Sequence, residues 1–261
     1  MIILSIKKIF LNFIVILSVS FSMLTINSCK EETGTEGLVY SLNEDDTYSV
    51  VGFNKPPQSF RFSSITIPAK YNKKPVTIID DYCFQYMEII EINLPEGLLK
   101  IGKNAFQGTQ IKNVTIPNSV TSIGDCCFSN SKLISATLGD GLEEVQGFES
   151  CSYLETVTFG KNVKKIASSA FLKCYKLNNI ELPDGLVSIG NTAFDSCSYL
   201  DNITIPSSLS SIGTLAFSDC NMLHNVFYRG TAEQWNDLIS NHTMGGNDRL
   251  INAYVVYNYT E

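Results

Sequence analysis

Cysteine is the residue type in this 261-residue sequence that offers the widest chemistry, and there are eight of them. Cys151, Cys174, Cys197 and Cys220 follow one another at a constant interval of 23 residues (174 − 151 = 23). Thiols aligned by a repeat can form disulfides, bind zinc or act as nucleophiles. Zinc is disfavoured because no Cys-x-x-Cys pair occurs, and the odd number left after Cys29 argues against a complete disulfide framework.

We therefore interpret the four periodic cysteines as small residues that fill the interior of a repeated structure. Cys83 and Cys127 occupy a column that other copies fill with alanine, so we expect them to be interior as well. Disulfides between stacked repeats stay open as an alternative, since they depend on the directions of the side chains.

Other candidate motifs fail on their spacing. Residues 97–104 nearly match a phosphate-binding loop, but Asn104 stands where Ser or Thr would hold magnesium, and the glycines belong to repeat columns. His224 and His242 lie on different segments, and adjacent acidic residues such as Glu143 and Glu144 are better explained as solvated surface than as acid–base pairs. The sequence predicts no catalytic residues, no metal site and no cofactor, and hence no enzyme.

The elements that position these residues form an internal repeat. Each copy has an apolar–polar–apolar strand, a proline or glycine that ends it, a second apolar pair and then a phenylalanine. The phenylalanine column is Phe84, Phe106, Phe128, Phe148, Phe171, Phe194 and Phe217. A period of this size predicts a solenoid in which stacking shelters the apolar side of each coil. Seven coils at about 4.8 Å each give a parallel sheet about 30 Å long.

The domain boundaries follow from where this pattern begins and ends. Residues 38–61 predict a β-hairpin that covers the first coil, 62–223 carry about seven repeats, and 224–261 form a C-terminal cap. In that cap, Thr231 and Gln234 have capping-box spacing before a helix with Trp235 on its apolar face, and residues 251–259 alternate as a final strand. In the fourth repeat Phe148 comes early after Gly147, so we expect a local irregularity there.

The repeat Leu-x-x-Ile-x-Ile-Pro-x-x-Val-x-x-Ile-Gly-x-x-Ala-Phe-x-x-Cys resembles the BspA-like leucine-rich repeats of bacterial surface proteins, over about residues 38–239. The resemblance implies a right-handed leucine-rich-repeat superhelix with a parallel β-sheet, short second strands and short helical turns, closed by a hairpin N-cap and a helix/strand C-cap. It also implies a role in attachment to host proteins, matrix or other cells.

The first 28 residues are typical of an export signal, with Lys7 and Lys8 before an apolar run over residues 9–24. The cysteine that follows, Cys29, resembles the lipidated residue of bacterial lipoproteins. The charged residues directly after it, 30–32, resemble the surface-export signal of lipoproteins in Bacteroidetes-type bacteria. We predict a lipoprotein signal over 1–28, a tether over 29–37 and a surface-exposed outer-membrane lipoprotein. An uncleaved anchor and ordinary secretion are the alternatives.

Charge restricts the partners of the mature chain. The full chain has a net charge of −7, and removal of Lys7 and Lys8 leaves −9, which disfavours binding to nucleic acid or anionic headgroups. Attachment to the membrane is expected to come from the lipid. We expect a monomer.

The polar positions of the first strands form the candidate binding face. The outward residues are Thr66, Asn93, Thr115, Thr137, Thr158, Glu181 and Thr204, and those two positions earlier include Asn113, Thr156, Asn179 and Asn202. We predict that this face binds an extracellular or host protein. Glycan capture is the alternative, although few aromatic residues project here. Threonine also simply suits an exposed strand, and that explanation stays open.

Overall fold

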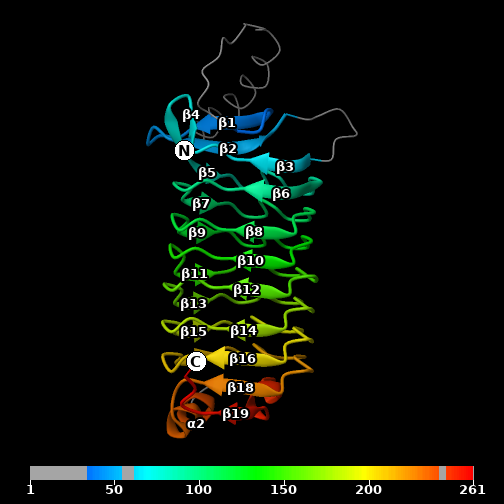
Figure 1. Ribbon diagram of the computed structural model, residues 1–261, viewed down its shortest axis with the longest axis vertical. Coiled ribbons are helices and arrows are strands. Elements are labelled where there is room, and N and C mark those ends of the chain that lie inside the picture. The colour runs from blue at the N-terminus through cyan, green and yellow to red at the C-terminus, as the bar shows by residue number, and fades with distance from the viewer. Residues whose placement is uncertain (1–33, 55–61, 241–244, 261) are drawn as a thin grey trace, which may run out of the picture. The chain divides into compact units, whose positions relative to one another are not determined.

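The computed structural model describes residues 34–54, 62–240 and 245–260, which belong to one compact unit (Figure 1). The expected signal over 1–28 and Cys29 lie outside the described residues. None of the helices in the described ranges has the length and apolar character needed to cross a bilayer. Thr35, in the described part of the expected tether, is bound to the first coil: its N–H donates to Thr66 O (2.9 Å), and its Oγ1 accepts from Thr66 N–H (2.7 Å).

The described unit is a parallel β-solenoid, as predicted, and Figure 1 shows its coils succeeding one another in chain order. One side of the coils carries the first strands, in which successive residues alternate between the interior and the surface. They are β3 (Phe62–Thr66), β6 (Ile89–Asn93), β8 (Asn113–Thr115), β10 (Ser135–Thr137), β12 (Thr156–Thr158), β14 (Asn179–Glu181), β16 (Asn202–Ile205) and β18 (Asn225–Tyr228).

The second side carries shorter strands. They are β5 (Lys74–Ile79), β7 (Lys100–Ile101), β9 (Ser122–Ile123), β11 (Glu144–Val145), β13 (Lys165–Ile166), β15 (Ser188–Ile189) and β17 (Ser211–Ile212). The predicted hairpin, β1 (Leu38–Leu42) with β2 (Tyr48–Phe53), is antiparallel, and β2 continues this side by pairing in parallel with β5. A short strand, β4 (Lys70–Tyr71), folds back on β5.

The third side is a run of tight turns centred on the phenylalanine column. All seven rings are fully buried, and successive rings stack with centroids 5.2 to 5.5 Å apart. The backbone N–H of each of the first six phenylalanines donates to a carbonyl of the next coil, as Phe106 N–H does to Cys127 O (2.8 Å). The expected helical turns take the form of i→i+3 hydrogen bonds, such as that from Gln107 N–H to Asn104 O.

The cysteine column lies beside these rings, and its thiols form hydrogen bonds between successive coils. Cys151, Cys174, Cys197 and Cys220 are buried and unpaired, and each thiol donates to the carbonyl of the phenylalanine one coil back, at 3.1 to 3.3 Å. Burial raises the pKa of Cys151 and Cys220 to about 12. The thiols are therefore protonated donors, which confirms the interior interpretation and leaves no disulfide in this column.

The fourth coil has the expected irregularity. Val145 and Phe148 are three residues apart (148 − 145 = 3), whereas Ile123 and Phe128 are five apart. Despite the shortening, Phe148 stays in the stack, 5.3 Å from Phe128. The shortening instead interrupts the ladder of second strands, because β9 and β11 do not pair. The Gln146 side chain donates a hydrogen bond to Ile123 O at this point (2.7 Å).

The C-terminal cap replaces a missing coil. Helix α2 (Ala232–Ser240) begins with the predicted capping box between Thr231 and Gln234. Asn247 is fully buried; its Oδ1 accepts from Phe217 N–H (2.8 Å) and its Nδ2 donates to Gly213 O (2.9 Å). The Asn247 Oδ1 therefore supplies the Phe217 N–H with the acceptor that a backbone carbonyl of a further coil would give.

The final strand is shorter than predicted. Residue Ile251 ends a one-turn helix, α3 (Asp248–Ile251), and only β19 (Tyr254–Val256) pairs with β18. The alternation of apolar residues over 251–259 predicted a strand from Ile251 onward, and this was wrong for the first residues. Ile251 belongs to a helical turn, in which its N–H donates to Asn247 O.

Candidate functional site

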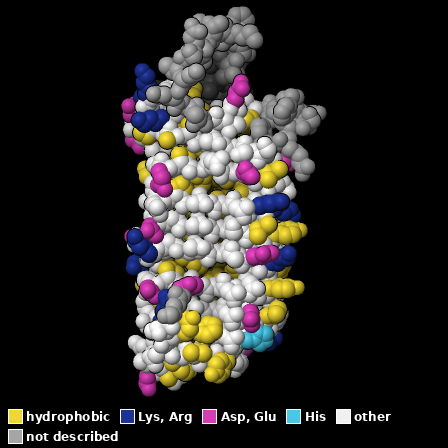
Figure 2. All heavy atoms as spheres, in the orientation of Figure 1, with side chains coloured by type: hydrophobic (Ala, Val, Ile, Leu, Met, Phe, Trp, Pro, Cys, Tyr) yellow, Lys and Arg dark blue, Asp and Glu magenta, His cyan; other side chains and the backbone are white. Residues whose placement is uncertain are grey.

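The predicted face is a polar surface made by the first strands. Asn93, Thr115, Thr137, Thr158 and Glu181 are exposed in the outward column, while Thr66 and Thr204 are half-buried. In the neighbouring column Asn113, Thr156 and Asn179 are exposed and Asn202 is half-buried. Figure 2 shows the result as a broad field without charge or apolar side chains across the middle of this face.

Pairing between strands fixes which predicted residues come together. Thr115, Thr137 and Thr158 are in register across β8, β10 and β12. Asn113 belongs to the same three strands and accepts a hydrogen bond from Ser135 Oγ (2.8 Å). This group forms the continuous centre of the face, with hydroxyl and amide groups repeated once per coil.

A second group forms an amide ladder toward the C-terminal end. Asn202 Nδ2 donates to Asn179 Oδ1 (2.7 Å), and Asn225 Nδ2 donates to Asn202 Oδ1 (2.8 Å). Each amide is thereby oriented by its neighbour, which fixes where the outer donors and acceptors point. Asn225 was absent from the predicted set, although it holds the same column position in the next coil.

Glu181 differs from the rest because it is already paired. Arg229 Nη2 contacts Glu181 Oε1 at 2.7 Å, and Arg229 Nη1 contacts Asp184 Oδ1 at 2.6 Å. Burial lowers the pKa of the Arg229 guanidinium, but hydrogen bonds to the two carboxylates outweigh it and raise the pKa above its ordinary value. Glu181 therefore acts as a structural ion-pair partner across two coils.

The first-strand ladder is interrupted twice on this face. β6 and β8 are neighbouring strands that do not pair, and β12 and β14 have the same relation. Each interruption coincides with a core residue that is only half-buried, Leu94 in the first case and Phe159 in the second. Their counterparts in intact coils, such as Ile116 and Leu138, are fully buried.

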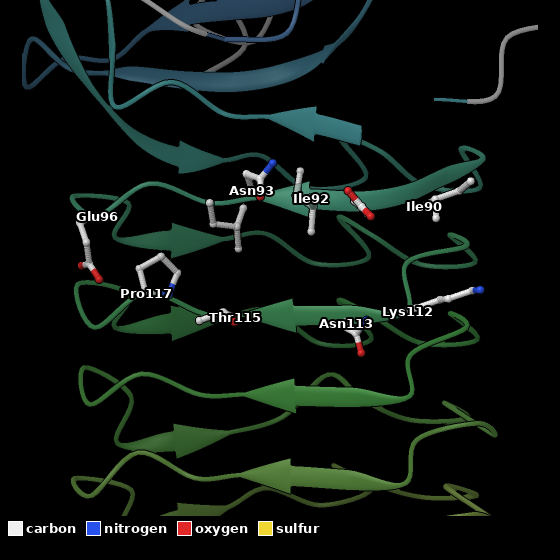
Figure 3. A pocket seen from close by; sticks show the side chains of 10 residues that line it. Ile90, Ile92, Asn93, Glu96, Lys112, Asn113, Thr115 and Pro117 are labelled. Atoms are coloured by element: carbon white, nitrogen blue, oxygen red, sulfur yellow. The ribbon is translucent and has the colours of Figure 1, made fainter. Parts of the chain in front are cut away.

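A hollow of about 450 Å³ occupies the first interruption (Figure 3). Three predicted residues, Asn93, Asn113 and Thr115, line it together with apolar residues of β6 and the side chains of Lys112 and Glu96. Figure 3 places Lys112 near the start of the strands and Glu96 beyond their ends. The repeat pattern does not predict this hollow, since the alternation of residues in β6 matches that of its neighbours.

An edge beside the polar face carries exposed aromatic residues that the sequence interpretation missed. Tyr153, Tyr175 and Tyr199 are each 42 to 57% exposed. Lys132 Nζ lies 4.6 Å and Lys176 Nζ 5.6 Å from the Tyr153 ring centroid, which is within cation–π range. The sequence signal that could have revealed them is their position one or two residues before the repeat leucine, where an interior residue is not required. Figure 2 shows apolar and charged side chains along this edge.

No group of three or more His, Cys, Asp or Glu side chains in the described ranges is arranged to hold a metal ion. Burial raises the pKa of Cys174 and Cys197 well above its usual range, so these thiols are poor nucleophiles. The first-strand face presents hydroxyl and amide groups at fixed spacing, with the hollow between β6 and β8 in it and the tyrosine edge beside it.

Comparisons with known proteins identify the family to which these repeats belong. A family model described as "BspA type Leucine rich repeat region" matches residues 58–147, 77–176 and 144–242. No curated protein matches the chain. Among solved structures, a leucine-rich repeat protein from Bacteroides ovatus has 22% identity and a TM-score of 0.47, covering 79% of this chain and 71% of its own.

Two further structures are similar at comparable identity. The T. pallidum leucine-rich repeat protein has 22% identity and a TM-score of 0.38, covering 75% of this chain and 71% of its own. A leucine-rich cell surface protein from Faecalibacterium prausnitzii has 18% identity and a TM-score of 0.33, covering 81% of this chain and 98% of its own.

Proposed function

This chain belongs to the BspA-type leucine-rich repeat family, and from that premise we propose that it is a protein-binding module displayed on the surface of a bacterial cell. The partner is an extracellular or host protein, and the biological role is adhesion. The observation that carries this proposal is the in-register polar strip Thr115–Thr137–Thr158 on a rigid stack of coils. Repeat proteins use such extended faces to bind macromolecules.

We place the chain at the outer membrane as a lipoprotein, attached through Cys29. The support is the basic start, the apolar run and the charged residues after Cys29. Labelled palmitate should be incorporated into the wild-type chain and not into Cys29→Ala, and protease added to intact cells should remove the protein. A wild-type chain that takes up no label, or one that protease cannot reach, would contradict this placement.

The binding role is tested with residues 30–261, the mature chain without its lipidated Cys29, on immobilised fibronectin, laminin and collagen. We expect saturable binding to at least one of them, and loss of that binding in the double variant Thr137→Lys, Thr158→Lys. Two bulky cations there obstruct the centre of the strip. Glu181 is left unchanged because its replacement would also disturb Arg229.

The matched control is Ser122→Lys, Ser188→Lys, which adds the same charges on the second-strand side. It should bind as the wild type does. If both double variants bind normally, the site lies elsewhere; if the control alone loses binding, the second-strand side is the binding surface.

Glycan capture is a second candidate, and the exposed tyrosine edge is what favours it. Aromatic rings supply the flat apolar surfaces on which sugars can stack, and Tyr199 is the most exposed of the three. A glycan array probed with wild type and with Tyr199→Ala distinguishes the two functions. Saturable glycan binding that needs Tyr199, without binding to any of the matrix proteins, would place glycan capture first.

A further inference from the structure

The ends of the solenoid are closed by side chains and short elements, with one exception. At the first coil, the outer N–H and C=O of Thr66 bond to Thr35. At the last coil, Trp235 of α2 is buried against the interior, and Asn247 accepts from the Phe217 N–H. The exception is β19, the last strand of the first-strand side: it pairs with β18 on one edge, and no described strand pairs with its outer edge (Figure 1).

This outer edge carries main-chain donors and acceptors. Tyr254 N–H donates to His224 O (2.8 Å), so the main-chain groups of Tyr254 face β18. Main-chain groups alternate between the two edges of a strand, so the N–H and C=O of Val255 point away from β18, as do the Ala253 C=O and the Tyr257 N–H. None of these four groups takes part in a hydrogen bond within the described residues.

β19 also lacks the features by which proteins protect an exposed strand edge, which are charged side chains, prolines or a covering element. Residues 250–260 contain no charged residue and no proline. By contrast, β1, the outermost strand at the other end, is followed by exposed Glu44, Asp45 and Asp46. Tyr254 is 71% exposed beside the unprotected edge. An edge of this kind is a template for pairing with another chain.

The edge is complementary to a second copy of itself. In an antiparallel pair centred on Val255, the N–H and C=O of this residue bond to those of Val255 in the other copy, and each Tyr257 N–H meets an Ala253 C=O. Tyr254 then lies opposite Val256 of the other copy on the outward face, as an aromatic–β-branched pair of the kind that stabilises sheets. A two-fold axis makes each of these contacts twice and closes the assembly at two chains.

We propose that two copies of this chain pair antiparallel through the outer edges of their β19 strands, in place of the monomer expected from the sequence. The tether joins the solenoid at the first coil, and β19 lies beyond the last, so the two solenoids meet tip to tip (Figure 1). The adhesive role of this contact rests on the proposed function, because chains displayed on two cells would be joined by it. A contact of this size is weak for one pair and gains strength from many copies.

Sedimentation equilibrium of residues 30–261 from about 10 μM to about 1 mM measures the pairing. The average mass of the wild type should rise from one chain toward two. Tyr254→Lys removes the aromatic pair and adds a cation from each copy, and should weaken the dimer at least about tenfold. Tyr86→Lys is the matched control, since Tyr86 is 68% exposed after the first buried phenylalanine, and it should dimerise as the wild type does. Circular dichroism melting curves check that both variants are folded.

A cross-link tests the register without depending on a loss of binding. The double variant Tyr254→Cys, Val256→Cys places thiols opposite each other in a pair whose Cα atoms lie about 4.5 Å apart, within the range that a disulfide spans. Mild oxidation should give a covalent dimer on a non-reducing gel. The wild type, which keeps its repeat cysteines, should give none.

Beads that carry the chain through an N-terminal biotin should cluster with the wild type and not with Tyr254→Lys. A wild type that stays monomeric throughout, a dimer that Tyr254→Lys leaves intact or Tyr86→Lys weakens equally, or the absence of the cross-link would overturn the pairing. Dimers in solution without clustering of beads would overturn its role between cells. Matrix-protein binding that is lost in Thr137→Lys, Thr158→Lys but kept in Tyr254→Lys would still support the proposed function, so the two can fail separately.

Discussion

The phenylalanine side and the first-strand side of the solenoid differ in how continuously successive coils contact one another. On the phenylalanine side, stacking is unbroken from Phe84 to Phe217, and even the shortened fourth coil keeps its ring in place. On the first-strand side the ladder is interrupted at β6/β8 and at β12/β14. The difference shows that burial of large apolar side chains, rather than pairing of strands, sets the spacing of the coils.

The second interruption has a visible cause in a side chain. Phe159 stands where other coils have Leu or Ile, and its ring packs edge-on against Phe171 with centroids 6.0 Å apart. A larger residue at this position occupies space between the coils on the strand side, while the stack on the opposite side is maintained. A rigid stack can therefore tolerate openings on the face that is available for binding.

The largest expected effect is on the uninterrupted side. Phe171→Ala removes a buried ring that stacks on Phe148 and Phe194, and should lower the free energy of unfolding by about 3–5 kcal/mol. Phe159→Ala, at an interruption and half-exposed, should cost much less, about 1–2 kcal/mol. Urea denaturation monitored by circular dichroism measures both. Equal losses would remove the distinction between the two sides.

The next effect concerns the end of the stack. Asn247→Ala leaves the buried Phe217 N–H and Gly213 carbonyl without these partners, and should cost about 2–4 kcal/mol. Hydrogen exchange should show amides of the last coil losing protection while those around Phe106 stay protected. As a control, Asn221→Ala removes an exposed amide whose Oδ1 accepts a solvent-exposed hydrogen bond from Arg249 Nη2 (3.1 Å), and it should change exchange little. Uniform loss of protection along the chain would mean that the cap stabilises every coil alike.

A smaller effect comes from the buried thiols. The pKa of Cys151 is raised by burial to about 12 from 9.0, so above pH 9 the unfolded chain releases a proton that the folded chain retains. Its contribution is complete below pH 9 and is lost as pH rises toward 12, by about 1.4 kcal/mol at pH 10. Wild type should therefore lose more stability between pH 8 and pH 10 than Cys151→Ala does. Parallel pH curves would show that this thiol is not shielded from water.

Much of the uninterrupted side could be predicted because each position there has a single physical requirement. A column of phenylalanines at 20- to 23-residue spacing has to be interior, and the small cysteines beside it fit between the turns. The capping box at Thr231 was equally readable, since helix N-termini need side-chain acceptors.

The openings on the strand side, and the pairings across it, could not be predicted. Asn113 and Ser135 sit in the same alternating pattern, yet only one of their strands has two paired neighbours. Arg229 and Glu181 are 48 residues apart, and Asn247 replaces a backbone carbonyl with a side chain. Periodicity describes what coils have in common, whereas these features arise where a coil departs from its neighbours.

The smallest expected effect tests whether long-range pairs on the strand side add stability. Glu181→Gln breaks one of the two contacts of Arg229, but the Glu181 side chain is 56% exposed, so the loss should be at most about 1 kcal/mol. Asp184→Asn, in which the carboxylate side chain is 83% exposed, should cost still less. Urea midpoints at low and high salt measure both, and added salt should reduce the difference from wild type. A loss comparable to that of Phe171→Ala would mean that ion pairs across the strand side, and not the ring stack, hold the last coils together.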